Sequence, residues 1–215
     1  MKIIKLIAFI LLVAIALMGF FVGVVFLDNA IKDSFDNKDV KLYESKEDYL
    51  TNAPNYGYYF DISTKEEFIE EDYSTNVFYK DNEIVRSETT IALKRSASIG
   101  EISDITINVA TNPTQSLLYK LTKNSFTNGA KARAESYNKV KTQISGMDVY
   151  GISFLDNVED GYSYGFLVEC SYANDCKVKI QLLIPVDIDT FNESSAYQRC
   201  VTKSAEILSL IKQQQ

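Results

Sequence analysis

The sequence predicts an α+β fold, a largely antiparallel sheet covered by helices and preceded by one N-terminal transmembrane helix. Three observations lead to this fold class. A long apolar stretch lies near the N-terminus, the predicted strands come in groups with few helices between them, and an apolar stripe at helical spacing runs along the last segment. Grouped strands with few helices favour an antiparallel sheet.

The apolar stretch covers residues 6–27 and reads LIAFILLVAIALMGFFVGVVFL, without a charged side chain. At a rise of about 1.5 Å per residue, it is long enough to cross a hydrocarbon core of about 30 Å. Lys2 and Lys5 precede it and Asp28 follows, so the positive-inside rule places residues 1–5 in the cytoplasm and residues 28–215 outside. A cleaved signal peptide is the competing interpretation. The apolar region of a signal peptide is, however, shorter than this stretch, and it ends in a small-residue cleavage site.

Two glycines inside this stretch, Gly19 and Gly23, have the small-xxx-small spacing that lets two membrane helices approach closely. Glycine pairs are also common in membrane helices that do not associate. The pair is therefore a candidate helix-dimer face, and the sequence does not set the oligomeric state.

Residues 28–50 are charged, show no clean period and predict a stalk, which leaves residues 51–215 for the extracytoplasmic domain. Period-two patterns and turn residues predict strands, and apolar spacing of three to four residues predicts helices. The expected strands are 55–62, 76–80, 84–93, 102–110, 141–144, 148–155, 162–170 and 176–184, and the expected helices are 64–72, 114–126 and 192–212. The buried stripe expected on the last helix consists of Tyr197, Val201, Ala205, Leu208 and Ile211.

The order of these elements over residues 102–212 carries a resemblance. A strand (ITINVAT), a Leu-rich helix (QSLLYKLTKNSF), a strand–turn–strand (ISGMDVYGI), a tyrosine-rich hairpin and a final AEILSLIK helix follow one another. This pattern resembles the PsbP-like or DcrB-like α-β-α sandwich, which is shared with a Ran-binding nuclear-import factor. The resemblance implies a non-catalytic binding or assembly module and, in the DcrB-like case, a place at the bacterial cell envelope. The expected location is therefore the bacterial inner membrane, with the domain in the periplasm.

The chain contains no histidine, which excludes histidine-activated serine and cysteine nucleophiles and histidine-ligated zinc or haem. The Ser-x-x-Lys pattern of Ser-Lys acyl enzymes occurs at Ser136–Lys139 and Ser209–Lys212, about as often as chance gives in so Ser- and Lys-rich a chain. No glycine-rich nucleotide loop occurs, and no catalytic, cofactor or metal site is predicted. A histidine-free Ser-Lys hydrolase and a structural subunit of a membrane complex remain the alternative functions.

Charge is unevenly distributed along a chain whose formal net charge is −7. An acidic chain is a poor partner for nucleic acid, because such binding depends on neutralising phosphates. Between residues 113 and 141, however, six basic residues stand against Glu135 alone: Lys120, Lys123, Lys131, Arg133, Lys139 and Lys141. They predict either a docking face for a protein or envelope partner, or a solvated helix face.

Two of the three cysteines, Cys170 and Cys176, flank the loop of the last predicted hairpin. A symmetric five-residue loop would place them opposite each other, where a cross-strand disulfide is allowed and would persist outside the cytoplasm. Free buried thiols are the alternative. Cys200 is expected as a small core residue of the last helix, and a disulfide from Cys200 to Cys170 or to Cys176 is a further alternative. Together these features predict a membrane-tethered, non-catalytic binding module.

Overall fold

The structure is a computed structural model that describes residues 39–53, 56–61, 70–95, 97–112, 125–158 and 161–213. Its elements in chain order are β1 (Asp39–Tyr43), α2 (Lys46–Asn52), β2 (Tyr58–Phe60), β3 (Glu70–Lys80), β4 (Glu83–Lys94), β5 (Asp104–Thr111), α4 (Ser125–Arg133), β6 (Ser136–Ile144), β7 (Met147–Val158), β8 (Gly161–Ala173), β9 (Cys176–Val186), α5 (Glu193–Ser209) and β10 (Ile211–Gln213).

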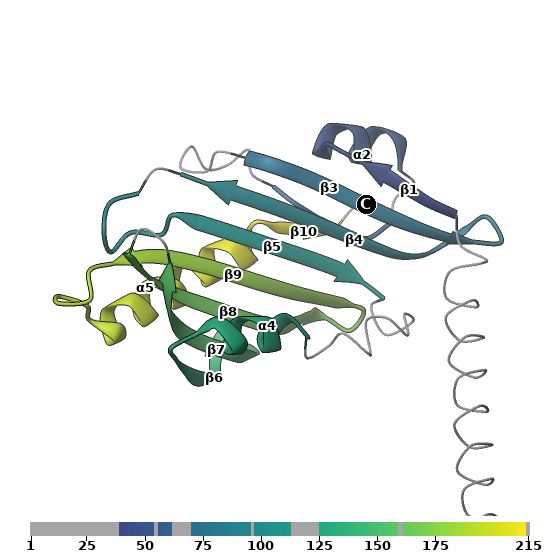
Figure 1. Cartoon of the computed structure of the whole chain (residues 1–215). Helices are drawn as coiled ribbons and strands as arrows, with labels where there is room; N and C mark the ends of the chain where they lie inside the picture. Colours follow the sequence, from purple (N-terminus) through teal and green to yellow (C-terminus); the bar gives the residue numbers. More distant parts are fainter. Residues whose placement is uncertain are drawn as a thin grey trace, which may run out of the picture.

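One antiparallel sheet of eight strands dominates the domain, in the order β1-β3-β4-β5-β9-β8-β7-β6 (Figure 1). Hairpins join β3 to β4, β6 to β7, β7 to β8 and β8 to β9, and β4 pairs with β5. Strands β3-β4-β5 and β6-β7-β8-β9 are therefore two meanders of consecutive strands, and β1 adds to the edge of the first. The two meanders meet where β5 pairs with β9, with Ile107 opposite Ile180. This seam is the long-range pairing that makes one sheet from two.

The inner face of the sheet is the apolar one, because side chains alternate between the two faces along each strand. Strand β9 shows the alternation best, since its buried residues are Cys176, Val178, Ile180, Leu182, Ile184 and Val186. Helix α5 contacts β8 and β9 on this face, and it passes behind them in Figure 1. The two-stranded sheet of β2 and β10 lies on the same side, where β2 contacts β5.

The outer face of the sheet is mostly polar, and a small buried apolar cluster lies on it under α4. Ala130 of α4 packs there with Ile152, Phe154 and Leu167. The Phe154 ring covers Gly165 on the neighbouring strand, where an added Cβ would come within 2.6 Å of the ring atom Cε2. An aromatic ring laid over a glycine in this way fixes the register of β7 against β8.

The predicted α+β fold class is wrong: the protein is mostly antiparallel β-sheet. The strands are longer than their local patterns indicated, because pairing extends them beyond the apolar alternation. β6, for example, begins at Ser136 rather than at residue 141, and its first four residues are exposed yet paired with β7. The predicted α-β-α sandwich is therefore replaced by a single large sheet with one long helix on its inner face.

The predicted transmembrane helix, with Gly19 and Gly23, lies outside the described residues. Within residues 39–53, 56–61, 70–95, 97–112, 125–158 and 161–213, no helix is long and apolar enough to span a membrane.

The structure differs from the sequence prediction at three element boundaries. Residues 39–50, assigned to the stalk, form β1 and most of α2, so the domain begins by Asp39 instead of residue 51. The predicted helix 64–72 is wrong at its end, because Glu70–Asp72 belong to β3 and pair with β4; its beginning lies outside the described residues. Most of the predicted helix 114–126 also lies outside them, and the described helix α4 begins at Ser125.

The last helix was predicted correctly in type but not in length or face. It ends at Ser209, and Ile211 leaves the helical stripe to pair with Phe60 of β2. The residues that α5 buries are Ala196, Cys200, Ser204, Ile207 and Leu208. Three residues of the predicted stripe, Tyr197, Val201 and Ala205, therefore lie one position away from the true face and flank it half-buried.

Candidate functional site

A basic and aromatic surface lies on the outer face at the β6 edge of the sheet. Ser145 and Gly146 form a two-residue turn with φ of 52° and 79°, which suits a type I′ hairpin and fixes the register of β6 against β7. In that register Lys141 lies opposite Tyr150. Lys139 and Tyr137 follow on the same face of β6, because side chains on one face recur at every second residue.

Cation–π geometry connects the lysines to the tyrosine rings. Lys131 of α4 holds its Nζ 5.5 Å from the centroid of the Tyr137 ring, and the Lys141 Nζ lies 6.0 Å from that of Tyr150. Both rings are about half exposed, at 47% for Tyr137 and 51% for Tyr150. We call Lys131, Tyr137, Lys139, Lys141 and Tyr150 the basic–aromatic face.

The lysines of the basic–aromatic face are not neutralised by the part of the chain that the structure describes. Within it, no carboxylate forms an ion pair with Lys131, Lys139 or Lys141, whereas Lys179 pairs with Glu169 on the same side of the sheet. A charged group over an aromatic ring attracts anions while the ring offers apolar contact. This surface can therefore receive an acidic partner without first breaking an internal ion pair.

Three of the six basic residues predicted as a docking face are brought together here. Lys120 and Lys123 lie outside the described residues, and Arg133 is the last residue of α4. Tyr137 and Tyr150 were not part of the prediction. The signal that could have found them is the hairpin turn itself, since counting outward from Ser145 and Gly146 sets Tyr150 against Lys141.

No family model, no curated protein and no solved structure matches this chain. The resemblance to PsbP-like and DcrB-like domains thus stays a prediction.

The cysteines are three free buried thiols, and the register of the last hairpin differs from the expected one. The loop is a two-residue turn with a bulge between Ser171 and Ala173, so Cys170 lies opposite Val178 and Cys176 lies opposite Ala173. Burial raises the pKa of the Cys170 thiol to about 11, and that of Cys176 and of Cys200 to about 12. These thiols stay protonated near neutral pH, which makes them poor nucleophiles.

The two Ser-x-x-Lys patterns do not form Ser-Lys dyads. Ser136 and Lys139 are three residues apart on the same strand, so their side chains lie on opposite faces of the sheet. The Ser209 hydroxyl donates to the carbonyl of Glu206 at the end of α5, and Lys212 lies in β10. Neither serine is placed to lose its proton to its lysine.

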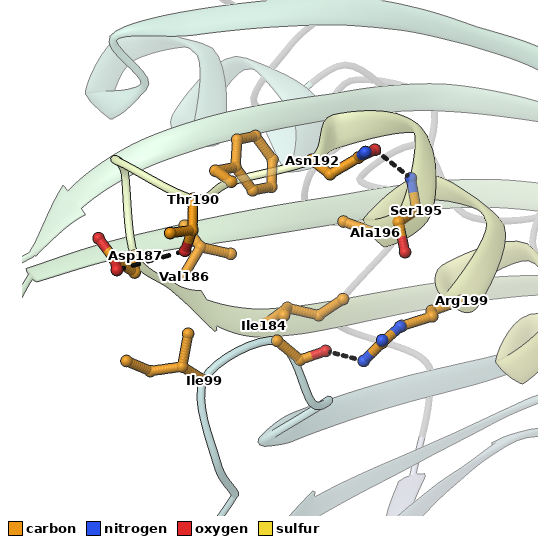
Figure 2. A pocket seen from close by; sticks show the side chains of 11 residues that line it. Ile99, Ile184, Val186, Asp187, Thr190, Asn192, Ser195, Ala196 and Arg199 are labelled. Atoms are coloured by element: carbon orange, nitrogen blue, oxygen red, sulfur yellow. Dashed lines mark hydrogen bonds between the residues drawn. The ribbon is translucent and has the colours of Figure 1, made fainter.

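A cleft of about 230 Å³ lies where β9 turns into α5, with Ile184, Val186 and Phe191 as apolar lining (Figure 2). Most of its polar groups hold the corner together. The guanidinium of Arg199 donates to the carbonyl of Gly100, and the Thr190 hydroxyl donates to Asp187 at 3.2 Å. Because these groups are already used, the cleft is best explained as packing between two loops and a helix start.

The start of α5 supplies a prediction at this corner. The Asn192 side chain accepts a hydrogen bond from the backbone N–H of Ser195 at 2.9 Å and so caps the helix. Asn192→Ala is expected to lower the free energy of unfolding by about 1 kcal/mol, as measured by urea denaturation. Asn192→Ser, which keeps an accepting oxygen at the cap, is the control and should lose much less. Equal losses in the two variants would show that the cap does not stabilise the helix.

Proposed function

We propose that this protein is a non-catalytic binding module of the bacterial cell envelope, tethered to the inner membrane through the apolar residues 6–27. Its basic–aromatic face docks an acidic protein partner on the periplasmic side. The observation that carries the proposal is a group of three lysines without a described carboxylate partner: Lys139 and Lys141 are exposed, Lys131 is half-buried, and two of the three lie over tyrosine rings.

The chemistry of the face supports binding rather than catalysis. Tyrosine is enriched in protein interfaces because it combines a large apolar surface with a polar end. Lysines at the rim of such an interface steer an oppositely charged partner and set its orientation. The serine–lysine geometry on β6 supports the non-catalytic interpretation, because the two side chains are on opposite faces of the sheet.

The position of the face within the sheet favours a protein partner over the lipids of the tethering membrane. The tether leads into β1, and β1 and β6 are the opposite edges of the sheet. Seven spacings of about 4.8 Å separate them, which is roughly 34 Å across the sheet. Charges in salt are screened over about 8 Å, so anionic lipid at the β1 edge would attract the lysines at the β6 edge only weakly. Tethering instead raises the effective concentration of the module near other envelope proteins.

The test is crosslinking in intact cells with tagged full-length protein, followed by mass spectrometry of the captured partners. The double variant Lys139→Glu, Lys141→Glu is expected to lose a recurrent acidic partner by about tenfold or more, since two attractive charges become repulsive. Lys80→Glu, Lys94→Glu is the matched control: it makes the same change of charge at two exposed strand lysines elsewhere, and it should keep the partner.

Either of two results would count against the proposal. If both double variants capture every partner as the wild type does, the basic–aromatic face is not the docking surface. Loss in both variants to the same degree would show that only net charge matters.

A further inference from the structure

Strand β6 is an edge of the sheet, and its free side has a definite pattern of backbone groups. Among the described residues β6 pairs only with β7, and Ser136 to Lys139, Lys141 and Gln143 are exposed. In a two-residue hairpin the residues flanking the turn, here Ile144 and Met147, form a hydrogen-bonded pair. Even-numbered residues of β6 therefore direct their N–H and C=O groups to β7.

The odd-numbered residues of β6 direct theirs outward. These are Tyr137, Lys139, Lys141 and Gln143, whose side chains lie on the outer face. The same residues that form the basic part of the docking surface thus also offer unpaired backbone donors and acceptors at the sheet edge. An extended segment laid along β6 would meet both sets at once.

From this coincidence we infer that the partner docks by strand addition: an extended acidic segment of the partner pairs antiparallel with β6 and becomes a ninth strand. The inference rests on the proposed function and specifies its mode. Acidic side chains at every second position of the added strand lie opposite Lys139 and Lys141 on the outer face. The residues between them lie on the inner side next to Val140, which is buried, so apolar residues fit there. The recognised pattern is acid–apolar–acid.

A second copy of the chain does not fit the same edge. Two β6 strands paired antiparallel about Val140 would set Lys139 of one against Lys141 of the other. Like charges directly opposite each other destabilise a strand pair, and lysines on an edge strand are a common barrier to self-association. The β6 edge therefore disfavours pairing with a second β6 strand and favours pairing with an acidic strand.

The test uses the full chain in detergent micelles and three fluorescent peptides of alternating glutamate and valine, with binding followed by anisotropy. The first peptide is unmodified, the second carries N-methyl groups on its glutamates and the third carries as many on its valines. In an antiparallel pair with β6 the glutamate N–H groups face the protein and the valine N–H groups face away. Methylation of the glutamates is expected to weaken binding about tenfold or more, and methylation of the valines is expected to leave it nearly unchanged.

Protein variants give an independent arm. Lys139→Pro and Lys139→Ala remove the same charge, but only the proline removes the outward N–H, and at this position it costs no bond to β7. We expect the unmodified peptide to bind Lys139→Pro several-fold more weakly than Lys139→Ala, with a thermal melt of each variant to verify folding.

The outcomes separate this inference from the proposed function. If the three peptides bind the wild-type protein equally and none of them binds the double variant Lys139→Glu, Lys141→Glu, strand addition is overturned. Docking by charge would then still stand. No binding of any peptide would also overturn strand addition by an acidic segment, and the crosslinking experiment would then decide the proposed function separately.

Discussion

The variant Gly151→Ala is expected to lose about 3 kcal/mol of its free energy of unfolding, the upper end of what overpacking usually costs. Gly151 lies on β7 between Val140 of β6 and Val168 of β8. An added Cβ would collide with the carbonyl oxygen of Leu167 and lie 2.7 Å from the Val168 Cα. These are backbone atoms, so relief requires β7 and β8 to separate. Thermal unfolding monitored by circular dichroism should show a Tm lower by roughly 6–12 °C.

A second glycine provides the matched control. Gly129 lies in α4, and a Cβ added there meets nothing within 4 Å. Gly129→Ala is expected to stabilise the protein by up to about 1 kcal/mol, because alanine is the better helix former. Should Gly151→Ala prove as stable as the wild type, the close approach of β7 and β8 at this point would be wrong.

Alkaline pH is expected to destabilise the domain through its three buried thiols, because ionisation of a thiol favours the unfolded chain. The folded pKa is about 11 for Cys170 and about 12 for Cys176 and for Cys200, against an ordinary value of 9.0. Below pH 9 both the folded and the unfolded chain keep these protons, and stability does not change. Above it the unfolded chain ionises first, so each thiol lowers stability by about 1.4 kcal/mol per pH unit until its folded pKa is reached.

Three such thiols together lower stability by about 4 kcal/mol per pH unit, so the typical 5–15 kcal/mol of a domain is largely lost by about pH 11. The measurement is Tm as a function of pH from 7 to 11. The triple variant Cys170→Ala, Cys176→Ala, Cys200→Ala should be less stable at pH 7, because it loses buried volume, but its Tm should fall less steeply above pH 9. A slope equal to that of the wild type would mean that the thiols are not responsible.

The local hairpins of the C-terminal half could be predicted from the sequence, because each strand pairs with its neighbour along the chain. Strand β1 could not. Its residues are exposed except Tyr43, and it becomes a strand only by pairing with β3, more than thirty residues on. The end of α5 failed for the same reason: Ile211 continues the helical spacing, but a distant partner, Phe60, takes it into a sheet. The sequence pattern shows which secondary structure a residue favours locally, and pairing with a distant strand overrides that preference.

The candidate site shows the same division. The lysines of β6 could be found by counting charge, yet the tyrosines depend on register. Cys170 was expected opposite Cys176, but it lies opposite Val178, two residues further along β9. The reason is that a bulge and a two-residue turn replace a symmetric loop. A bulge sets two residues of one strand against one residue of its partner, so it shifts the register by an amount that the apolar pattern of the two strands does not indicate.

The seam between β5 and β9 has a consequence for how the chain reaches its native state. During synthesis, β5 is complete about 65 residues before Cys176, its first partner residue in β9, has been made. Until then its alternating Ile105, Ile107 and Val109 form an apolar ribbon with an unpaired edge. Closing so long a loop is slow and leaves the nascent chain open to intermolecular pairing. Chaperone protection during biogenesis is therefore needed most between the completion of the first meander and the arrival of β9.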